Sequence, residues 1–453
     1  MYSAQHTIIR EQKYPALFAY LDTNTMLAKN LYNAALFRIR QIFTGWDKDS
    51  RTANEQEVFD EVRVTEELYG ISIRRVISYF HLEKLMRATR NPDFFSGLPI
   101  HSAQHILKLA VQNFKAWLAA LKMYKADSSQ FLGKPRMPGY LKGDRTGFIF
   151  SNQEAVFYRE KGYIKLPRTK EILSAAYAQE SWKLKQINVK CAHGAIDIIP
   201  VFEVPDDERQ RSGNSFTECA AIDFGVENIA AIVYTDGHSR IYKGGAILSH
   251  IQLYAKRRAK AVSEMTHGHK NVKAHSKRLD RMDLYHENYI RDALHQVSRS
   301  IVNSCVSHNV GTLVLGANRN WKQEADIGKQ NNQKFVMLPI ARLQAMIQYK
   351  AEREGIHVVI QEESYTSRAS FPDKDNIPVY GSGVDTVFSG KRVKRGLYKT
   401  STGILINADC NAAANILRKA LPNEADKIKD FQTLISPEVM KPKRSPVKGI
   451  AAA

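Results

Sequence analysis

The order of apolar segments in the C-terminal half of this 453-residue chain limits the folds that it can adopt. Three short segments follow one another closely and are separated by turn signals that include Asp236-Gly237. Two more alternate with longer helical patterns. The sequence thus predicts five strands and a final helix, at residues 219–224, 229–234, 240–243, 312–315, 357–360 and 409–419. A meander of three strands followed by two strands joined through helices predicts an α/β domain.

Acidic residues lie at the ends of these segments. Asp223 ends the first strand, Glu362 and Glu363 follow the fifth, and Asp409 begins the final helix. The element order is compatible with an RNase H-like fold, in which the first strand is central and the carboxylates can converge. Converging carboxylates can bind two divalent ions about 3.5–4 Å apart, which activate water and stabilise a leaving phosphate oxygen. We therefore predict Asp223, Glu362, Glu363 and Asp409 as catalytic residues that bind two Mg²⁺ ions, with Mn²⁺ as the alternative.

Two simpler interpretations stay open for these acids. Asp409 could serve only as a cap of the final helix, which is a common role of aspartate. Successive strand residues point to opposite faces, so only one of Glu362 and Glu363 can face the site while the strand is regular. Glu363 is nearer the strand end, whereas Glu362 shares a face with Val358 and Ile360. The sequence does not choose between them.

The net charge indicates a polyanionic partner. The chain has 66 Lys and Arg against 46 Asp and Glu, a formal net charge of +20. Lys and Arg that neutralise phosphates release condensed counterions, so nucleic acid is favoured over an anionic membrane or a merely solvated basic surface. We expect a soluble, cytoplasmic protein, since no run of about 18 apolar residues and no leader-like start is found. The four cysteines form no C-x-x-C pair, which argues against a zinc ribbon and favours free thiols.

The N-terminal part of the chain predicts two further domains. Apolar residues at four-residue steps, such as Leu31, Ala35 and Ile39, indicate a helical domain over 23–130 that includes a basic helix over 71–90. Short alternating segments predict an antiparallel β-barrel over 131–210, to which 1–22 contributes. Basic and aromatic residues in these regions and in the C-terminal half are candidates for nucleic-acid binding. They are Arg74, Arg75, Lys134, Arg136, Tyr140, Lys142, Lys256, Arg257, Arg258, Arg319, Trp321, Lys322, Arg392, Lys394 and Arg395.

Several of these segments together resemble the TnpB family of transposon-encoded, RNA-guided nucleases, from which compact type V CRISPR effectors derive. The resemblance is carried by Gly133-Lys-Pro-Arg-Met-Pro-Gly-Tyr, Ala221-Ile-Asp-Phe-Gly, Tyr365-Thr-Ser and, most specifically, Asn407-Ala-Asp-Cys-Asn-Ala-Ala-Ala-Asn. It implies a RuvC nuclease domain, here 216–435, a wedge-like barrel and a helical recognition domain. It also implies Mg²⁺, a guide RNA and cleavage of target double-stranded DNA next to a short flanking motif.

The chain departs from the family pattern at two places. The family usually carries a zinc ribbon before the final Asp, whereas the interval 367–404 is basic and has no cysteine, so no zinc is expected. The family's middle acid usually ends the fourth strand, where this chain has Gly316. We favour a relocated catalytic Glu at the end of the fifth strand. The alternatives are a nuclease-inactive RNA-guided DNA-binding regulator, a type V effector that uses a CRISPR RNA, and an actin-like kinase. Residues 436–453 predict a basic, disordered tail.

Overall fold

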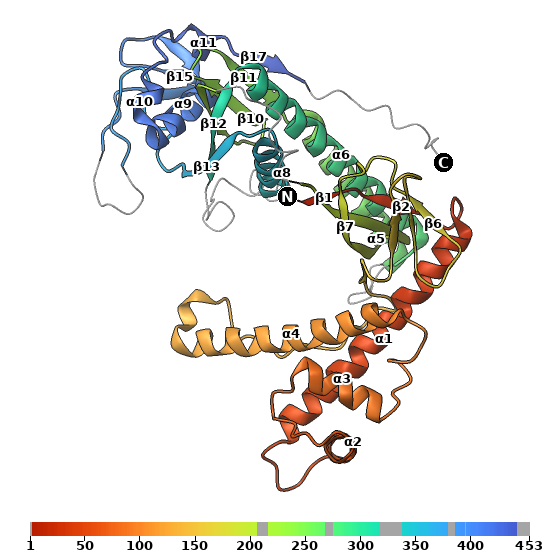
Figure 1. Ribbon diagram of the computed structural model, residues 1–453. Helices are drawn as coiled ribbons and strands as arrows, with labels where there is room; N and C mark the ends of the chain where they lie inside the picture. The colour runs from red at the N-terminus through yellow and green to blue at the C-terminus, as the bar shows by residue number, and fades with distance from the viewer. Residues whose placement is uncertain are drawn as a thin grey trace. The chain divides into compact units, whose positions relative to one another are not determined.

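The computed structural model describes residues 2–205, 216–267, 275–317, 338–378, 386–394 and 396–441. The chain divides into two compact units, Met1–Pro205 and Asp206–Ala453 (Figure 1). Each unit combines helices with β-sheets, so the predicted mixed α/β class is confirmed. Among the described residues, no helix is long and apolar enough to cross a membrane.

The first unit has four α-helices and two antiparallel sheets among its described residues. The helices, with one short 3₁₀ turn, are α1 (Pro15–Gly45), α2 (Ala53–Tyr69), α3 (Tyr79–Ala88), α4 (Ile100–Ala126) and η1 (Ser128–Gln130). The strands are β1 (Tyr2–Ala4), β2 (Thr7–Ile9), β3 (Phe148–Ser151), β4 (Val156–Tyr158), β5 (Tyr163–Lys165), β6 (Ile172–Ser174), β7 (Lys183–Ala192) and β8 (Ala195–Glu203). The larger sheet has the order β1-β8-β7-β3, with β2 also on β8, and β4-β5-β6 form the smaller one. Buried side chains of the helices and of both sheets form one core.

Three details of the first unit differ from the predictions. Helix α1 begins at Pro15, so residues 15–22 are helical and do not belong to the strands. The basic helix over 71–90 is shorter, since α2 ends at the left-handed Gly70 and α3 begins only after Ser78, which caps it. Ile73 and Ile77 are buried in the irregular segment between them. The pairings of the described strands leave β1 and β3 at opposite edges of the larger sheet and do not close it into a barrel.

The second unit is built on a six-stranded sheet with the order β13-β12-β9-β10-β11-β17. Its strands are β9 (Glu218–Asp223), β10 (Asn228–Tyr234), β11 (Ser239–Lys243), β12 (Val310–Ala317), β13 (His357–Glu362) and β17 (Glu438–Met440). The described helices are α5 (Gly245–Thr266), α6 (Lys277–Ser307), α8 (Ile340–Arg353), α9 (Ala408–Ala420), α10 (Pro422–Ala425) and α11 (Gln432–Ile435). Strands β9, β10 and β11 are an antiparallel meander, and β12 and β13 run parallel to β9. The first strand of the unit, β9, lies between β12 and β10, which is the central position that the sequence led us to expect.

A separate three-stranded sheet lies within the basic interval, formed by β14 (Lys391–Lys394), β15 (Leu397–Lys399) and β16 (Leu405–Asn407). Two carboxylates hold the loops around it. Asp373 accepts hydrogen bonds from the Ser370 hydroxyl (2.5 Å) and from Ser401, and Asp375 accepts them from the main chain of Ser370 (2.7 Å) and from Ser389. The interval is therefore held together by carboxylate–hydroxyl contacts.

The predicted disorder of residues 436–453 is wrong at its start. Glu438–Met440 forms strand β17, which pairs in parallel with β11 at the edge of the sheet. The free edge of β11 supplies the main-chain donors and acceptors that this short segment needs. Residues 442–453 lie outside the described part of the chain.

Candidate active site

The two faces of the large sheet pack against different helices. Ala220 and Ile222 of β9 share a core with residues of α5, α6 and α8, whereas Cys219 and Ala221 share one with α9. Strand side chains alternate between faces, so Asp223 belongs to the α9 face. The same alternation places Gly316, two residues after Val314 of the α9 core, on this face of β12.

Strand β13 brings Glu363 to the same face. Val359 packs in the α9 core and Val358 in the opposite one, so residue 363 follows the phase of Val359. Burial and, to a smaller extent, the nearby Glu362 charge raise the pKa of Glu363 to about 7. Burial also raises the pKa of Asp223 well above its usual range, and the charges of Glu363 and Asp409 add to that effect. The structure thus brings Asp223, Glu363 and Asp409 together.

Gly316 opens the space that Glu363 occupies. A Cβ atom built on Gly316 would lie 2.9 Å from Glu363 Oε2, 2.7 Å from Ile416 Cδ1 and 3.1 Å from the carbonyl oxygen of Ile222. Real Cβ atoms essentially never show contacts under 3.0 Å, so a side chain at residue 316 would require Glu363 and Ile416 to move. The glycine at the end of β12 therefore leaves room for a carboxylate that comes from the neighbouring strand.

Glu362 is held away from this cluster. Its Oε2 lies 2.5 Å from Lys419 Nζ, and its Oε1 accepts a hydrogen bond of 2.6 Å from the main-chain N–H of Ser364. Although burial acts to raise its pKa, the hydrogen bonds from Lys419 and Ser364 lower it below the usual range. The alternatives left by the sequence are thereby separated, since only Glu363 lies with Asp223 and Asp409.

Asp409 does not cap helix α9. Asn407 is the N-cap, and its side-chain oxygen accepts hydrogen bonds from the main-chain N–H groups of Asp409 (3.0 Å) and Cys410 (3.1 Å). The carboxylate of Asp409 instead accepts a hydrogen bond of 2.5 Å from Asn228, whose side-chain oxygen accepts one of 2.9 Å from Lys243. Asn228 was not predicted from the sequence, and its position at the start of strand β10 carried no signal for this role.

Two asparagines of α9 position the segment that follows Glu363. Asn411 accepts a hydrogen bond from the main chain of Phe371 (2.9 Å) and donates one to Ala369 (2.8 Å). Asn415 donates to the carbonyl oxygens of Thr366 (2.9 Å) and Ala369. Thr366 in turn donates its hydroxyl to the carbonyl oxygen of Glu363 (2.7 Å). Asn411 and Asn415 are four residues apart in the Asn407–Asn415 motif, so both lie on one face of helix α9.

The donors at this site suit a hard divalent cation. Asp223, Glu363 and Asp409 offer oxygen ligands only, which Mg²⁺ prefers. All three residues are half-buried. Burial is the main cause of the raised pKa values of Asp223 and Glu363, and neighbouring carboxylate charges add to it, with a smaller opposing effect of Arg392 on Asp223. These residues are therefore the ones that could hold the Mg²⁺ ions that the sequence predicts.

Comparisons with known proteins address the same part of the chain. Residues 200–322 match a family model described as a probable transposase (OrfB_IS605), and residues 341–416 match a model described as a Cas12f1-like TNB domain. The chain is TnpB-like. The resemblance inferred from the sequence is thereby confirmed.

Curated relatives of this TnpB-like chain are matched over part of their length. The CRISPR-associated endodeoxyribonuclease Cas12f2 of a Micrarchaeota archaeon is 26% identical over 217 residues, which are 47% of this chain and 38% of the relative. The CRISPR-associated endodeoxyribonuclease Cas12f1 of Sulfoacidibacillus thermotolerans is 33% identical over 135 residues, 30% of this chain and 27% of the relative. The matches thus span less than half of the relatives' length.

Two solved structures cover 90% of this chain. They are titled as cryo-EM structures of the Cas12f1-sgRNA-target DNA complex and of the CRISPR-Cas12f ternary complex, and 84% and 85% of their chains are covered. Sequence identity is 13% and 14%, with TM-scores of 0.47 and 0.33. At these values they add no support to the assignment.

The predicted nucleic-acid-binding residues of the TnpB-like chain fall into three groups. Lys134, Arg136, Tyr140 and Lys142 are exposed along an extended segment of the first unit. Asn33 of α1 fixes that segment through two hydrogen bonds to the main chain of Leu141, of 2.8 and 3.1 Å. Lys134, Arg136 and Lys142 therefore remain available for a ligand, whereas Arg40 lies over the ring of Tyr140, 5.0 Å from its centroid.

The second group is partly engaged within the protein. Arg75 pairs with Asp47 (2.5 Å) and lies over the ring of Phe43, while Arg74 is exposed. On α5, Lys256 and Arg257 are exposed, whereas Arg258 pairs with Asp283 at 2.9 Å. The charge runs in the sequence do not distinguish a paired arginine from an available one.

The third group belongs to the basic interval and its neighbourhood. Arg392 of β14 reaches the acidic cluster, with a guanidinium nitrogen 3.4 Å from Asp409 Oδ1, and Lys394 on the same strand is exposed. Arg319, Trp321, Lys322 and Arg395 lie outside the described residues.

Proposed function

We propose that this chain is an RNA-guided endonuclease that cleaves double-stranded DNA next to a short flanking motif. One observation carries the proposal: Asp223, Glu363 and Asp409 converge, with Glu363 in the space that Gly316 leaves open. Three carboxylates in this arrangement supply the oxygen ligands that a metal-dependent phosphodiester hydrolase needs. The family resemblance and the printed names of the curated relatives, both CRISPR-associated endodeoxyribonucleases, support DNA as the substrate.

In this proposal the second unit is a RuvC-like nuclease domain with an RNase H-like fold. The helices of the first unit form the recognition domain, and its strands form the wedge-like domain. The net charge of +20 suits a protein that holds a guide RNA and its heteroduplex with target DNA through the sugar-phosphate backbone. The exposed side chains from Lys134 to Lys142 are candidates for such contacts.

Each residue of the site has a distinct part in the proposed reaction. Two Mg²⁺ ions, when bound, would activate the attacking water and stabilise the leaving oxygen. Asp223, Glu363 and Asp409 would hold them, and Asn228 fixes the orientation of the Asp409 carboxylate. Arg392, which contacts Asp409 in the absence of a ligand, can turn to a phosphate oxygen of the bound DNA.

The test begins with the RNA that co-purifies with the protein. Its sequence identifies the guide and shows whether it derives from a transposon end or a CRISPR array. A plasmid with the matching target is then incubated with the protein, this RNA and Mg²⁺. We expect cleavage that Asp223→Asn abolishes and EDTA prevents.

The rival function is a nuclease-inactive regulator, which the absence of an acid at Gly316 favours. The same preparation of protein, RNA and target plasmid distinguishes the regulator from the nuclease. Tight, guide-dependent binding of the target without any cleavage in Mg²⁺ or Mn²⁺ would establish the regulator and overturn the nuclease. Absence of any bound RNA would overturn both.

A further inference from the structure

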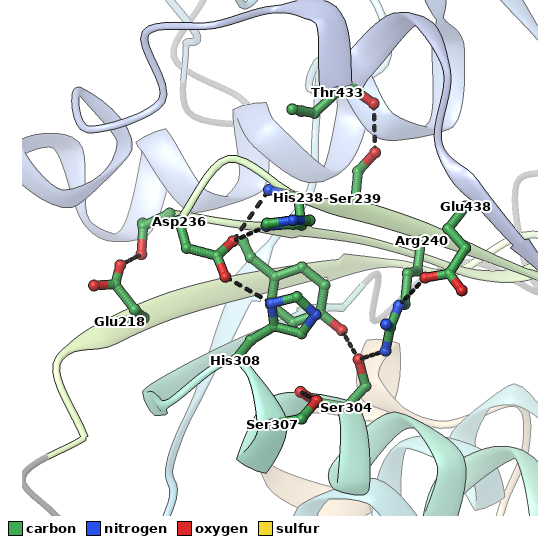
Figure 2. A network of polar contacts seen from close by, with 12 residues as sticks. Glu218, Asp236, His238, Ser239, Arg240, Ser304, Ser307, His308, Thr433 and Glu438 are labelled. Carbon is green, nitrogen blue, oxygen red and sulfur yellow. Dashed lines mark hydrogen bonds and ion pairs between the residues drawn. The ribbon is translucent and has the colours of Figure 1, made fainter.

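A second cluster of metal-ligating side chains lies in the same unit. Asp236 and His238 belong to the turn between β10 and β11, and His308 follows the last residue of α6 (Figure 2). One ligand atom of each residue lies within 4.8 Å of the other two. The two carboxylate oxygens of Asp236 face different rings, with Oδ2 2.6 Å from His308 Nδ1 and Oδ1 3.1 Å from His238 Nδ1.

This cluster is separate from the carboxylates of the candidate active site. In the pairing of β9 with β10, Ala231 lies opposite Asp223 and Tyr234 lies opposite Ala220. The turn that follows Tyr234 is therefore at the end of the sheet where β9 begins, whereas Asp223 is where β9 ends. A strand of this length spans roughly 17–20 Å, so the two groups of ligands cannot share an ion.

Two of the three side chains are held in place before any ligand binds. The ring of His308 stacks on the fully buried ring of Tyr234, with centroids 4.3 Å apart, and only 13% of its side chain is exposed. Asp236 is fixed by the hairpin turn. The main-chain N–H of Tyr234 donates to the carbonyl oxygen of His238, and the main-chain N–H of His238 donates to Asp236 Oδ1. His238 is 66% exposed and can adjust its position.

We propose that Asp236, His238 and His308 bind one divalent cation of the zinc class. Imidazole nitrogens favour Zn²⁺, Co²⁺ and Ni²⁺ over Mg²⁺, which prefers oxygen ligands. Ligand atoms at about 2.0–2.1 Å around a tetrahedral Zn²⁺ are about 3.3 Å from one another. The present contacts of 2.6 and 3.1 Å are close to that spacing, so small movements of the rings admit the ion.

The bound ion would clamp the β10–β11 turn to the end of α6, and water would complete its coordination. Without metal, the same side chains form a hydrogen-bonded group around one carboxylate. Binding at Nδ1 of both histidines requires that these nitrogens carry no proton, so the ion displaces any proton that they hold. Two neighbouring contacts support the position of α6 beside β10 and β11. The Tyr234 and Ser304 hydroxyls lie 2.5 Å apart, and Arg240 donates to the Ser304 hydroxyl (Figure 2).

The test uses Co²⁺ and Zn²⁺ with the full chain after removal of metals by a chelator. The triple variant Asp223→Asn, Glu363→Gln, Asp409→Asn removes the carboxylate site and serves as the background. In this background at pH 7.5 we expect one equivalent of Co²⁺ with a visible absorption band, and no displacement by millimolar Mg²⁺. Zn²⁺ should displace the Co²⁺ and raise the temperature of thermal unfolding.

Two added substitutions make the test specific. His238→Ala removes an exposed ligand, so the fold should be unaffected, and affinity for Co²⁺ should fall at least about tenfold. His357→Ala removes an exposed histidine at the start of β13 and should change nothing. The proposal is overturned if His238→Ala binds Co²⁺ as tightly as the background and gains the same thermal shift from Zn²⁺. Absence of Co²⁺ binding in the background overturns it as well.

Discussion

The carboxylate of Glu363 occupies the space beside Gly316, with its Oε2 atom 2.9 Å from where a Cβ atom at residue 316 would lie. The two residues come from neighbouring parallel strands, β12 and β13. This relationship explains how the sheet can lack an acid at the end of β12 and still gather three carboxylates. It also makes Gly316 a residue that the site requires.

Gly316→Ala should destabilise the protein by about 1–3 kcal/mol, as other overpacked core positions do. The new methyl group meets Ile416 and the carbonyl oxygen of Ile222 as well as Glu363, so the strand that carries Asp223 must also shift. Urea unfolding measures the stability and plasmid cleavage measures the activity, which should fall as well. Gly245→Ala at the start of α5, where a Cβ atom meets open space, is the control. Wild-type stability in Gly316→Ala would contradict the placement of Glu363.

Replacement of the two adjacent glutamates should have different effects on cleavage. Glu363→Gln removes a metal ligand that contributes several kcal/mol to stabilising the transition state, so the cleavage rate should fall at least about 100-fold. Glu362→Gln removes an ion pair with Lys419, whose side chain is only 10% exposed and keeps its hydrogen bond to the Ser364 carbonyl oxygen. The rate should stay within about threefold of wild type, because Glu362 lies outside the carboxylate cluster. Single-turnover cleavage with saturating guide RNA measures both. The opposite ranking would show that Glu362 is the ligand.

Metal-free protein should lose stability as the pH rises from about 4.5 to about 7. In this range the folded state keeps a proton on Glu363, whose pKa is raised to about 7, while the unfolded state has already lost it. The free energy of unfolding in EDTA, measured at several pH values, should therefore fall less steeply for Glu363→Gln. Glu362→Gln should not flatten it, since the pKa of Glu362 is lowered. For the same reason, Mn²⁺ affinity should increase through pH 7.

Arg392→Ala should separate metal binding from cleavage. The guanidinium of Arg392 lies 3.4 Å from Asp409 Oδ1 and competes with cations for that carboxylate. Its removal should leave Mn²⁺ affinity equal or higher, while cleavage falls because a contact to phosphate is lost. Lys399→Ala, an exposed cation on the neighbouring strand β15, is the matched control. A loss of Mn²⁺ affinity in Arg392→Ala would assign the residue a structural role instead.

Asn411→Ala should weaken the support of the segment after Glu363. The carbonyl oxygen of Ala369 keeps its hydrogen bond from Asn415, but the main-chain N–H of Phe371 loses its partner inside the protein. An unpaired buried donor costs about 1–3 kcal/mol. We expect this loss in urea unfolding, with weaker Mn²⁺ binding, and no change for Asn423→Ala, which is exposed on α10.

Local patterns predicted the elements of the second unit well, because each strand and helix there has its own apolar period. In the first unit, the sequence contains a helix-start signal that identifies α2 more sharply than its apolar residues do. Thr52 and Glu55 form a capping box, which marks the start of helix α2. The helix predicted over 71–90 was too long because the basic residues were given more weight than Gly70 and Ser78, which end one helix and cap the next.

The sequence by itself determined the succession of strands and helices along the chain and the acidic positions Asp223 and Asp409 at their ends, since both follow from apolar periodicity and from turn and capping residues. Tertiary structure alone decided between Glu362 and Glu363, because that choice depends on a glycine from another strand and on Lys419 from a helix. It also joined Asp236 to His308, which are 72 residues apart. Contacts between distant segments depend on how the chain packs, and no local pattern records them.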